Sequence, residues 1–406
     1  MEENLKAARD IHPKTPVAAL RQGYTQEELS ATFSIDLVSA TTGMSNTYVQ
    51  TAIGRRGVFV SLAEVLTLLN LDAFSETFVP RSQIPTYLLN RQKVASDTLQ
   101  THSEHEFFQG SATELIPRLP KKGVQCVVTS TPYWGMRLYN DCVEVEWADG
   151  EVCSFGNEQT PEAFIRHTIE VLYLLRPSLT EDGSVWWNLM DTYNTRTQIR
   201  SNASETLLAM QGKDTRGWKD YSCRRYSAGH SFLKDGEQCF IPTRVAERAS
   251  KIGYWVKSLI TWKKIGSMPE TVESRVTREL EYVIHLSVQR TPYFSKANYN
   301  QLIPQLGGRN HKFEADKLTD IWCLPTTSGQ DGHGAQFPTA LPGRCIALST
   351  REGDLVVDPF VGGGTTTLAA ALLNRRSIGF DVSGGYLNIA KKKLSQVMAA
   401  QTPTLF

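Results

Sequence analysis

Two short hydrophobic runs, each ending abruptly at a turn, stand out in the pattern of apolar and polar positions. The first, residues 124–128, leads into the polar and aromatic turn 130–134, Ser-Thr-Pro-Tyr-Trp, and the second, residues 355–357, leads into Asp358 and the glycine-rich turn 359–364. Apolar runs of this length, bounded by turn residues, predict buried strands. Because α/β enzymes carry their reactive groups at the carboxyl edge of the sheet, we expect the two turns to form one site.

Further strands and helices alternate around these two runs, which predicts an α/β fold with a doubly wound sheet. We expect residues 255–262 and 281–287 to form a hairpin-like pair of strands at one edge of that sheet. The other expected strands are residues 105–110, 184–189 and 377–381. The expected helices are residues 113–119, 162–175, 241–253 and 384–398, with one that opens at 333–338 and one that begins near Thr365.

Residues 25–71 have the rhythm of a small helical unit. Apolar residues at helical spacing are followed by the turn 42–45 and by a second helix, for which Ser45 is a suitable N-cap. This is the pattern of a helix-turn-helix, but also of an ordinary helical hairpin that caps a neighbouring domain. Residue types that reach base edges and phosphates lie on or just after the second helix: Asn46, Thr47, Gln50, Arg55 and Arg56.

The chain is divided near residue 100 by a polar stretch that contains two prolines. We expect residues 1–100 to form the helical N-terminal region and a linker, and residues 101–406 to form the catalytic domain. Two insertions are expected in that domain, near residues 194–234 and 263–320, where periodicity is weak.

Composition narrows the class of protein only modestly. The chain has 406 residues and a formal net charge of +1, so any basic surface must be a local patch. Its seven cysteines show no CxxC spacing, which argues against a zinc site and a disulfide framework, and we expect no metal. Neither a signal peptide nor an apolar run of membrane-spanning length is evident, so a soluble protein of the cytoplasm is expected, with no membrane contact.

The glycine-rich turn 359–364 predicts a ligand site at the start of a helix. Glycines let the backbone approach a ligand closely, and a helix N-terminus offers free N–H groups. The turn lacks the Lys of a phosphate loop and is not a GxGxxG pattern, which disfavours phosphate transfer and NAD binding. Asp381, at the end of the next strand, is placed to bind ribose hydroxyls, or only to cap the helix that follows it.

The pairing of STPYW with DPFVGGGTT resembles the permuted, or beta-group, amino-methyltransferases of DNA, whose catalytic motif is Ser or Asp, then Pro, Pro and an aromatic residue. The similarity extends from about residue 105 to residue 394 and includes GSATELIPRLP, DGSVWWNLMDTY and HGAQFPTALPGR. It implies a Rossmann-like, S-adenosylmethionine-dependent methyltransferase sheet in permuted order, with the cofactor strand beside the catalytic strand. It also implies double-stranded DNA as substrate and a restriction-modification system with a cognate restriction endonuclease. A monomer or a dimer is expected.

The same resemblance assigns the residues of the site. The catalytic turn is Ser130, Thr131, Pro132 and Tyr133, in which Thr131 replaces the family's usual proline. The residues expected to bind S-adenosylmethionine are Phe337, Pro338, Asp358, Phe360, Gly362, Gly364, Thr365, Thr366 and Asp381.

The chemistry of an exocyclic amino group explains the residue types of the catalytic turn. Because the amino lone pair is delocalised into the base, the nitrogen must pyramidalise to attack a sulfonium methyl group, and acceptors aimed at its two protons favour that change. The Ser130 hydroxyl and a backbone carbonyl can supply those acceptors, and Tyr133 can stack on a base rotated out of the duplex. Thr131 keeps its carbonyl and stays extended because Pro132 follows it, so we expect activity to survive the replacement.

Basic and aromatic residues are interleaved in the 194–234 stretch, and a basic loop lies between the strands 255–262 and 281–287. This composition suits DNA contact, although a solvated surface insertion has the same composition. The residues expected to contact DNA are Arg55, Arg56, Arg216, Arg224, Arg225, Lys263, Lys264 and Arg275. Asp191 and Tyr193, after the strand 184–189, are expected to line the pocket, or Asp191 to cap a loop.

The predicted function is transfer of a methyl group to N4 of a flipped cytosine, because members of the family with Ser at position 130 mostly act on cytosine. Adenine N6 is the alternative target. Cytosine C5 chemistry is disfavoured, because it needs a nucleophilic Cys, usually after Pro, and the chain has no Pro-Cys pair. Two other classes stay open: a catalytically decayed DNA-binding regulator, marked by Thr131, and a methyltransferase of RNA or protein.

Overall fold

The computed structural model describes most of the chain. The described residues are 23–54, 57–70, 76–91, 97–135, 143–194, 198–199, 224–225, 233–234, 236–265, 273–326 and 337–401.

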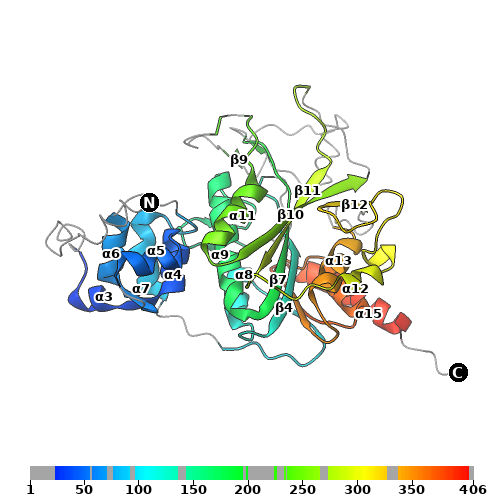
Figure 1. The fold of residues 1–406 in the computed structure, drawn as a ribbon, viewed down its shortest axis with the longest axis horizontal. Helices are drawn as coiled ribbons and strands as arrows, with labels where there is room; N and C mark the ends of the chain where they lie inside the picture. The colour runs from blue at the N-terminus through cyan, green and yellow to red at the C-terminus, as the bar shows by residue number, and fades with distance from the viewer. Residues whose placement is uncertain are drawn as a thin grey trace.

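An eight-stranded sheet forms the centre of the molecule (Figure 1). Its strand order is β12-β10-β11-β7-β4-β13-β14-β3. The strands are β3 His105–Gln109, β4 Val124–Ser130, β7 Leu179–Leu189, β10 Trp255–Ile265, β11 Leu280–Ser287, β12 Ile321–Pro325, β13 Leu355–Asp358 and β14 Arg376–Asp381. Within this sheet only β11 runs antiparallel to its neighbours.

The order of the strands confirms a doubly wound sheet in permuted order. From β4 the chain moves to β7 on one side, whereas from β13 it moves to β14 on the other side. The winding therefore reverses between β4 and β13, which pair directly in parallel, with Val356 opposite Cys126 and Val357 opposite Val127. An open α/β sheet binds its ligands at the carboxyl side of such a reversal.

The predicted pair of strands at 255–262 and 281–287 is confirmed, but its predicted position at the edge of the sheet is wrong. β10 and β11 pair antiparallel, and β12 adds to the outer side of β10 in parallel, with Trp262 opposite Trp322. The backbone groups on that side of β10 need partners, and β12 supplies them. β12 follows a polar, irregular stretch, so its five residues carry too short a pattern to be recognised.

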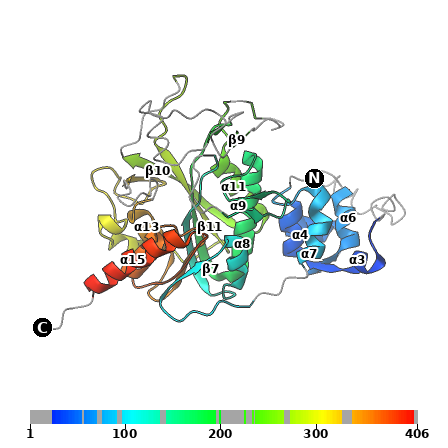
Figure 2. The same ribbon diagram turned by 180° about the vertical axis from the view of Figure 1, so that it is seen from behind.

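Helices cover both faces of the sheet (Figures 1 and 2). One face carries α8 Ala112–Leu115, α9 Pro161–Leu175 and α11 Ile241–Lys251, and the other carries α12 Lys296–Asn300, α13 Ala340–Ser349, α14 Thr365–Leu372 and α15 Gly384–Gln401. Alternate residues of β4 serve the two apolar layers: Val127 packs in the α9 layer, and Cys126 and Val128 pack in the α13 layer. The continuous apolar run that predicted this strand reflects burial on both faces.

The N-terminal region folds as a small helical unit. It contains α3 Gln26–Ser30, α4 Ile35–Thr42, α5 Asn46–Ala52, α6 Leu62–Asn70 and α7 Ile84–Arg91, with a two-stranded sheet of β1 Thr32–Ser34 and β2 Phe59–Ser61. The predicted helix, turn and helix of 35–53 are confirmed. Gly43 ends α4 with a left-handed φ of 73°, and the Ser45 hydroxyl accepts a hydrogen bond from the Tyr48 N–H at 3.2 Å.

This helical unit lies beside α9 and α11 (Figures 1 and 2) and shares their apolar layer. The ring of Phe78, which is fully buried, lies 5.5 Å from the ring of Tyr173 of α9. Arg248 of α11 donates to the carbonyl of Thr77 at 3.4 Å. The division of the chain near residue 100 stays a prediction, because the two parts share one apolar core.

The described helices do not combine the length and apolar character that a membrane span requires.

A buried ion pair fixes part of the predicted 263–320 insertion onto α13. Arg344, fully buried, binds Glu314 through two contacts of 2.7 and 2.9 Å and donates to the carbonyls of Gly307 and Gly308 at 2.6 and 3.2 Å. Burial alone would raise the pKa of Glu314, but the hydrogen bonds and charge of Arg344 lower it. Gly343 allows this approach, because a Cβ there would lie 2.2 Å from the carbonyl oxygen of Leu306.

We expect the substitution Arg344→Met to lower the free energy of unfolding by about 3–5 kcal/mol, because it leaves the Glu314 carboxylate buried without its cation. Chemical denaturation, followed by circular dichroism, measures this loss. The double variant Arg344→Met with Glu314→Gln should recover part of it. Equal stability of Arg344→Met and the wild type would contradict the buried pairing.

Candidate active site

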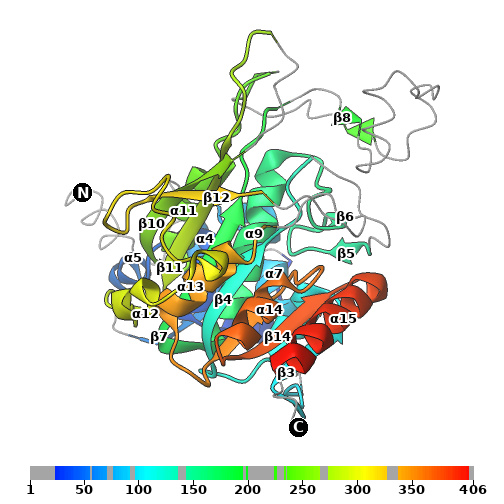
Figure 3. The same cartoon turned by 90° about the vertical axis from the view of Figure 1, so that its right-hand side faces the viewer.

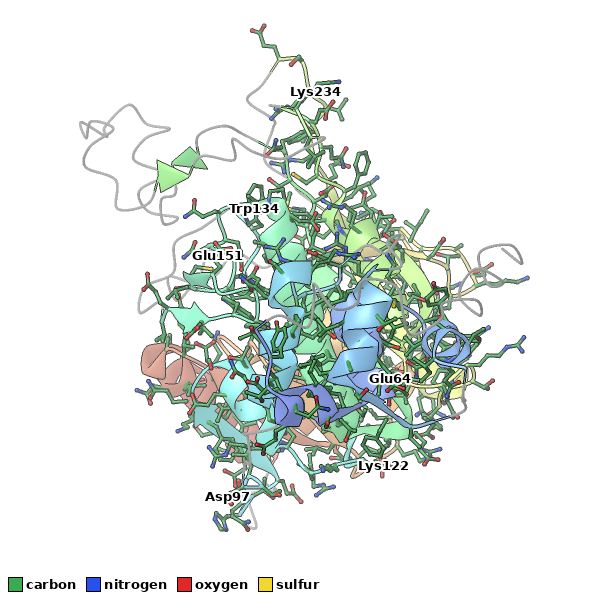
Figure 4. The ribbon with its side chains drawn as sticks, turned by 90° about the vertical axis from the view of Figure 1, so that its left-hand side faces the viewer. Glu64, Asp97, Lys122, Trp134, Glu151 and Lys234 are labelled. Atoms are coloured by element: carbon green, nitrogen blue, oxygen red, sulfur yellow. The ribbon has the colours of Figure 1, made fainter. Side chains whose placement is uncertain are left out.

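The catalytic turn lies at the carboxyl edge of the sheet, beside the reversal of winding. β4 ends at Ser130, which stands opposite Asn188 of β7. Lys122, just before β4, and Trp134, just after it, lie toward opposite ends of the molecule (Figure 4). The turn after β4 and the glycine-rich turn after β13 therefore open on the same edge, as the sequence predicts.

Five side chains meet at this edge in a polar cluster, which we call the Ser130 cluster: Ser130, Tyr133, Asn188, Lys264 and Glu281. Nδ2 of Asn188 lies 2.7 Å from the Tyr133 hydroxyl, 2.9 Å from Oε2 of Glu281 and 3.2 Å from Oγ of Ser130. The Tyr133 hydroxyl donates to the same oxygen of Glu281 and lies 3.2 Å from Oγ of Ser130. Nζ of Lys264 lies 3.3 Å from Oε1 of Glu281. A serine hydroxyl, a phenol and a carboxylate are thus joined by hydrogen bonds.

The sequence pattern does not predict the places of Asn188 and Glu281 in this cluster. Both are buried, and they come from β7 and β11, which are neighbours in the sheet but are separated by 93 positions in the chain. One signal in the sequence could have indicated Asn188: it is a polar residue in a strand segment whose other residues are all buried. A buried amide needs partners, so its presence there marks a site.

Thr131, the replacement in the catalytic turn, is buried, with only 3% of its surface exposed. Its hydroxyl has no hydrogen-bond partner among the described residues. Pro132 beside it contacts the loop 143–160, where Gly156 has a φ of +86° and a Cβ would lie 3.0 Å from Cβ of Pro132. The catalytic turn is therefore packed against this loop.

The loop behind the turn is held by further hydrogen bonds. The indole N–H of Trp134 donates to the carbonyl of Glu158 at 2.9 Å, and the Gly135 N–H donates to the carbonyl of Gly156 at 3.2 Å. Glu151, in the same loop, lies on the same side of the molecule as Trp134 (Figure 4). A displacement of this loop would therefore move the catalytic turn.

His167 of α9 anchors this loop between two carboxylates. Its Nε2 lies 3.1 Å from Asp149 and its Nδ1 3.2 Å from Glu158, and its ring stacks on Trp147 with centroids 4.2 Å apart. Burial alone would lower the pKa of His167, but hydrogen bonds with Asp149, Cys153 and Glu158 outweigh it and raise the pKa to about 11. Side chains of metal-ligating types gather here, and their contacts with the His167 ring form a hydrogen-bonded anchor for the loop.

We expect His167→Asn to destabilise the protein by about 3–5 kcal/mol near neutral pH, because two buried carboxylates lose their shared cation. The folded-state pKa of about 11 lies above the ordinary 6.5. The contribution of His167 to the free energy of unfolding is therefore complete below pH 6.5 and is lost as the pH rises toward 11.

Denaturant unfolding at several pH values checks this prediction. The stability difference between the wild type and His167→Asn should shrink as the pH rises. His102→Asn, at an exposed position, is the control variant. A difference that grows with pH would contradict a charged His167.

Asp358 joins the catalytic strand to the glycine-rich turn. Its carboxylate accepts from the Thr129 hydroxyl at 2.7 Å, from the Phe360 N–H at 3.0 Å and from the Thr366 hydroxyl at 2.6 Å. Burial raises the pKa of Asp358 to about 6, although these hydrogen bonds oppose the shift. Asp358 and Thr366, both predicted to bind cofactor, are thus engaged with each other and hold the turn. Their direct contact with cofactor stays a prediction.

Asp381, at the end of β14, reaches back to the glycine-rich turn. Its Oδ2 accepts from the Gly362 N–H at 2.9 Å and its Oδ1 accepts from the Ser383 N–H at 2.8 Å, and burial raises its pKa. The space beside Gly362 is open, since a Cβ there would have no neighbour closer than 4.0 Å. Gly364 differs: its Cβ would lie 2.7 Å from Cβ of Ala390, so it allows α14 and α15 to pack. The opening beside Gly362 and the acid across it fit a ligand with hydroxyl groups.

The remaining predicted cofactor residues surround the same edge. Thr365 begins α14, directly after the glycines. The ring of Phe360 lies between two aromatic rings, with its centroid 4.8 Å from that of Phe155 and 6.1 Å from that of Trp187. Phe337 and Pro338 precede α13, and Phe337 packs against its apolar layer.

The residues predicted to contact DNA are only partly described. Arg55, Arg56 and Arg216 lie outside the described residues, and for Arg224 and Arg225 the structure gives only the backbone, as strand β9, paired with β8 Gln198–Ile199. Lys263 is exposed, as expected, but Lys264 turns inward to Glu281. Arg275 stacks on Tyr193, with its guanidinium carbon 3.8 Å from the ring centroid. Residues 273–279, between β10 and β11, extend away from the sheet (Figure 3).

Two side chains of α5 that could read bases are occupied within the helical unit. Nδ2 of Asn46 donates to Asp36 at 2.6 Å, and Nε2 of Gln50 donates to the carbonyl of Gly57 at 3.4 Å. These contacts favour the simpler interpretation of a helical hairpin that covers the catalytic domain. A role of this unit in DNA contact stays a prediction.

Asp191 has the capping role that was the second expectation for it. Its carboxylate accepts from the N–H groups of Phe240 and Ile241, at 3.1 and 2.9 Å, at the start of α11. A carboxylate satisfies the free N–H groups of a helix start. Tyr193, two residues later, is the platform for Arg275.

Several known proteins are similar to this chain. The N6/N4 methyltransferase family of DNA methylases matches residues 124–392. The type II methyltransferase M.Cfr9I of Citrobacter freundii is 29% identical over 292 residues, covering 71% of this chain and 86% of the relative. M.SmaI of Serratia marcescens is 26% identical over 292 residues, covering 70% and 89%. Among solved structures, the PvuII DNA methyltransferase (cytosine-N4-specific) is 17% identical, covers 74% of this chain and 93% of its own, and has a TM-score of 0.49. The chain belongs to the N6/N4 DNA methylase family and is a DNA methyltransferase.

Proposed function

We propose that this DNA methyltransferase transfers a methyl group from S-adenosylmethionine to the exocyclic N4 of a cytosine flipped out of double-stranded DNA. The observation that supports this most is the position of the Ser130 hydroxyl, within a hydrogen-bonded cluster beside the reversal of winding between β4 and β13. By the family resemblance, members with Ser at that position mostly act on cytosine, with exceptions, so adenine N6 is the alternative target.

The turn supplies what an amino group needs to react. Oγ of Ser130 and the carbonyl of Thr131 act as acceptors for the amino protons and favour the pyramidal nitrogen of the transition state. The ring of Tyr133 stacks on the flipped base. S-adenosylmethionine supplies an electrophilic methyl group on a sulfonium.

The cofactor fits the edge beside the glycine-rich turn. The open space at Gly362 and the N-terminus of α14 suit the carboxylate and backbone of its methionine part, and Asp381 suits its ribose hydroxyls. Phe337, Pro338 and Phe360 would add apolar contact. This placement would bring the donor methyl group to the edge of the sheet that carries Ser130.

The proposal includes a restriction-modification role with a partner endonuclease, since relatives that cover most of this chain are type II methyltransferases. Exposed basic residues such as Lys263, together with Arg275 and the stretch 194–234, would bind the phosphates of DNA.

The reaction product tests the proposal directly. The purified protein is incubated with unmethylated genomic DNA and S-adenosylmethionine, and the digested nucleosides are identified by mass spectrometry. We expect N4-methylcytosine. N6-methyladenine would move the target to adenine, and no methylated nucleoside, with DNA binding intact, would favour a decayed regulator in which Thr131 marks the loss.

The roles of Ser130 and Asp381 predict opposite kinetic effects. Ser130→Ala should slow methyl transfer by about 10²–10³-fold, with the Kd for S-adenosylmethionine almost unchanged, because it removes an acceptor used in the transition state. Asp381→Ala should weaken cofactor binding far more than it slows transfer at saturating cofactor. Single-turnover rates and calorimetric titration separate the two effects, and equal losses of both quantities in each variant would contradict these roles.

A further inference from the structure

The Ser130 cluster contains a carboxylate that the proposed function does not use. Glu281 is buried, and only 9% of its side chain is exposed. It binds the Tyr133 hydroxyl and the Asn188 amide through Oε2, and pairs with Lys264 through Oε1 at 3.3 Å. Methylation of an amino group leaves an excess proton on the nitrogen. Building on the proposed function, we propose that Glu281 receives this proton through a relay of two hydroxyls, Ser130 and Tyr133.

The hydrogen bonds of the cluster run in one direction. Tyr133 has a single hydroxyl proton, and it donates this proton to Glu281. In the 3.2 Å contact between Ser130 and Tyr133, the serine must therefore donate and the phenol oxygen must accept. The sequence of donors from Ser130 through Tyr133 to Glu281 is the arrangement that a proton relay requires.

Asn188 fixes this arrangement. Its amide N–H groups must face Glu281, because its carbonyl oxygen would be repelled by the carboxylate. The same nitrogen contacts Oγ of Ser130 at 3.2 Å, which leaves a lone pair of that oxygen for an N–H of the substrate. Oδ1 of Asn188, on the other side of the amide, is buried and has no hydrogen-bond partner among the described residues.

The proton step balances. The amino nitrogen uses its electron pair to bond to the methyl carbon, and the carbon–sulfur bond of the donor breaks with its pair left on sulfur. The nitrogen, now cationic, passes a proton to Oγ of Ser130, Ser130 passes its own proton to the Tyr133 oxygen, and Tyr133 passes its proton to Glu281. The nitrogen becomes neutral and the carboxylate becomes a carboxylic acid. Lys264 keeps its charge throughout and favours the carboxylate before transfer.

Tyr133→Phe is the sharpest variant, because it removes the relay and keeps the ring that would stack on the base. The family motif accepts Phe at this position, so the variant should fold. Glu281→Gln keeps the size of the side chain and an acceptor oxygen but cannot take a proton at neutral pH. Glu279→Gln, two positions away with an exposed side chain, is the matched control.

The experiment measures single-turnover methyl transfer to unmethylated genomic DNA by the full-length protein across a range of pH. We expect Tyr133→Phe and Glu281→Gln each to lower the rate by roughly 10²-fold, with the double variant no slower than either single variant. The single-turnover rate of the wild type should fall at acid pH, because a protonated acceptor cannot take the proton from the amino nitrogen. This fall should be absent from Tyr133→Phe and Glu281→Gln. The Kd values for cofactor and DNA should stay within a factor of about two.

A second measurement does not depend on turnover. The Tyr133 hydroxyl donates to the Glu281 carboxylate, so Glu281→Gln should change the tyrosine ultraviolet difference spectrum, whereas Glu279→Gln should leave it unchanged. In a Tyr133→Phe background, Glu281→Gln should cause no further change in that spectrum. A wild-type rate and pH profile for Tyr133→Phe, or losses that multiply in the double variant, would overturn the relay. A wild type that transfers no methyl group would instead overturn the proposed function.

Discussion

The parallel pairing of β4 with β13 is the contact on which the rest of the site depends. Two residue pairs join the described strands β4 and β13. The carboxylate of Asp358 adds a further link, because it accepts hydrogen bonds from the hydroxyls of Thr129, on β4, and Thr366, on α14. Because the winding reverses here, the chains that leave the two strands diverge and their turns share one edge. The catalytic turn and the glycine-rich turn are therefore held in fixed relation by backbone pairing and one buried acid.

Buried charges hold the irregular backbone around this centre. His167 lies between two carboxylates in the loop behind the catalytic turn, and Arg344 binds Glu314 and two carbonyls on the opposite face of the sheet. Loops cannot satisfy their polar groups by strand pairing, so buried side chains must do it for them. Such charges are costly to bury unless they are paired, which makes each pair specific to one arrangement of its loop.

The Ser130 cluster combines positioning and chemistry in the same hydrogen bonds. Glu281 and Asn188 hold the hydroxyls of Ser130 and Tyr133 in place, and the order of donors in the cluster also suits proton removal. Lys264 has a different role in this cluster from the one that its residue type predicts. Its type and its neighbour Lys263 suggest a phosphate contact, but its amine lies against a carboxylate.

The sequence by itself determined the doubly wound class, the two turns, the helix pair of the N-terminal unit and the residue types of the catalytic turn. Strong apolar runs, turn residues and caps are local signals, because strand burial and helix ends depend on near neighbours in the chain. Only the tertiary structure decided that β12 covers β10, that Asp191 caps α11, and that Asn188 and Glu281 join Ser130. These outcomes depend on which distant strands lie side by side, and a polar residue in a buried strand does not reveal its partner until the sheet is assembled.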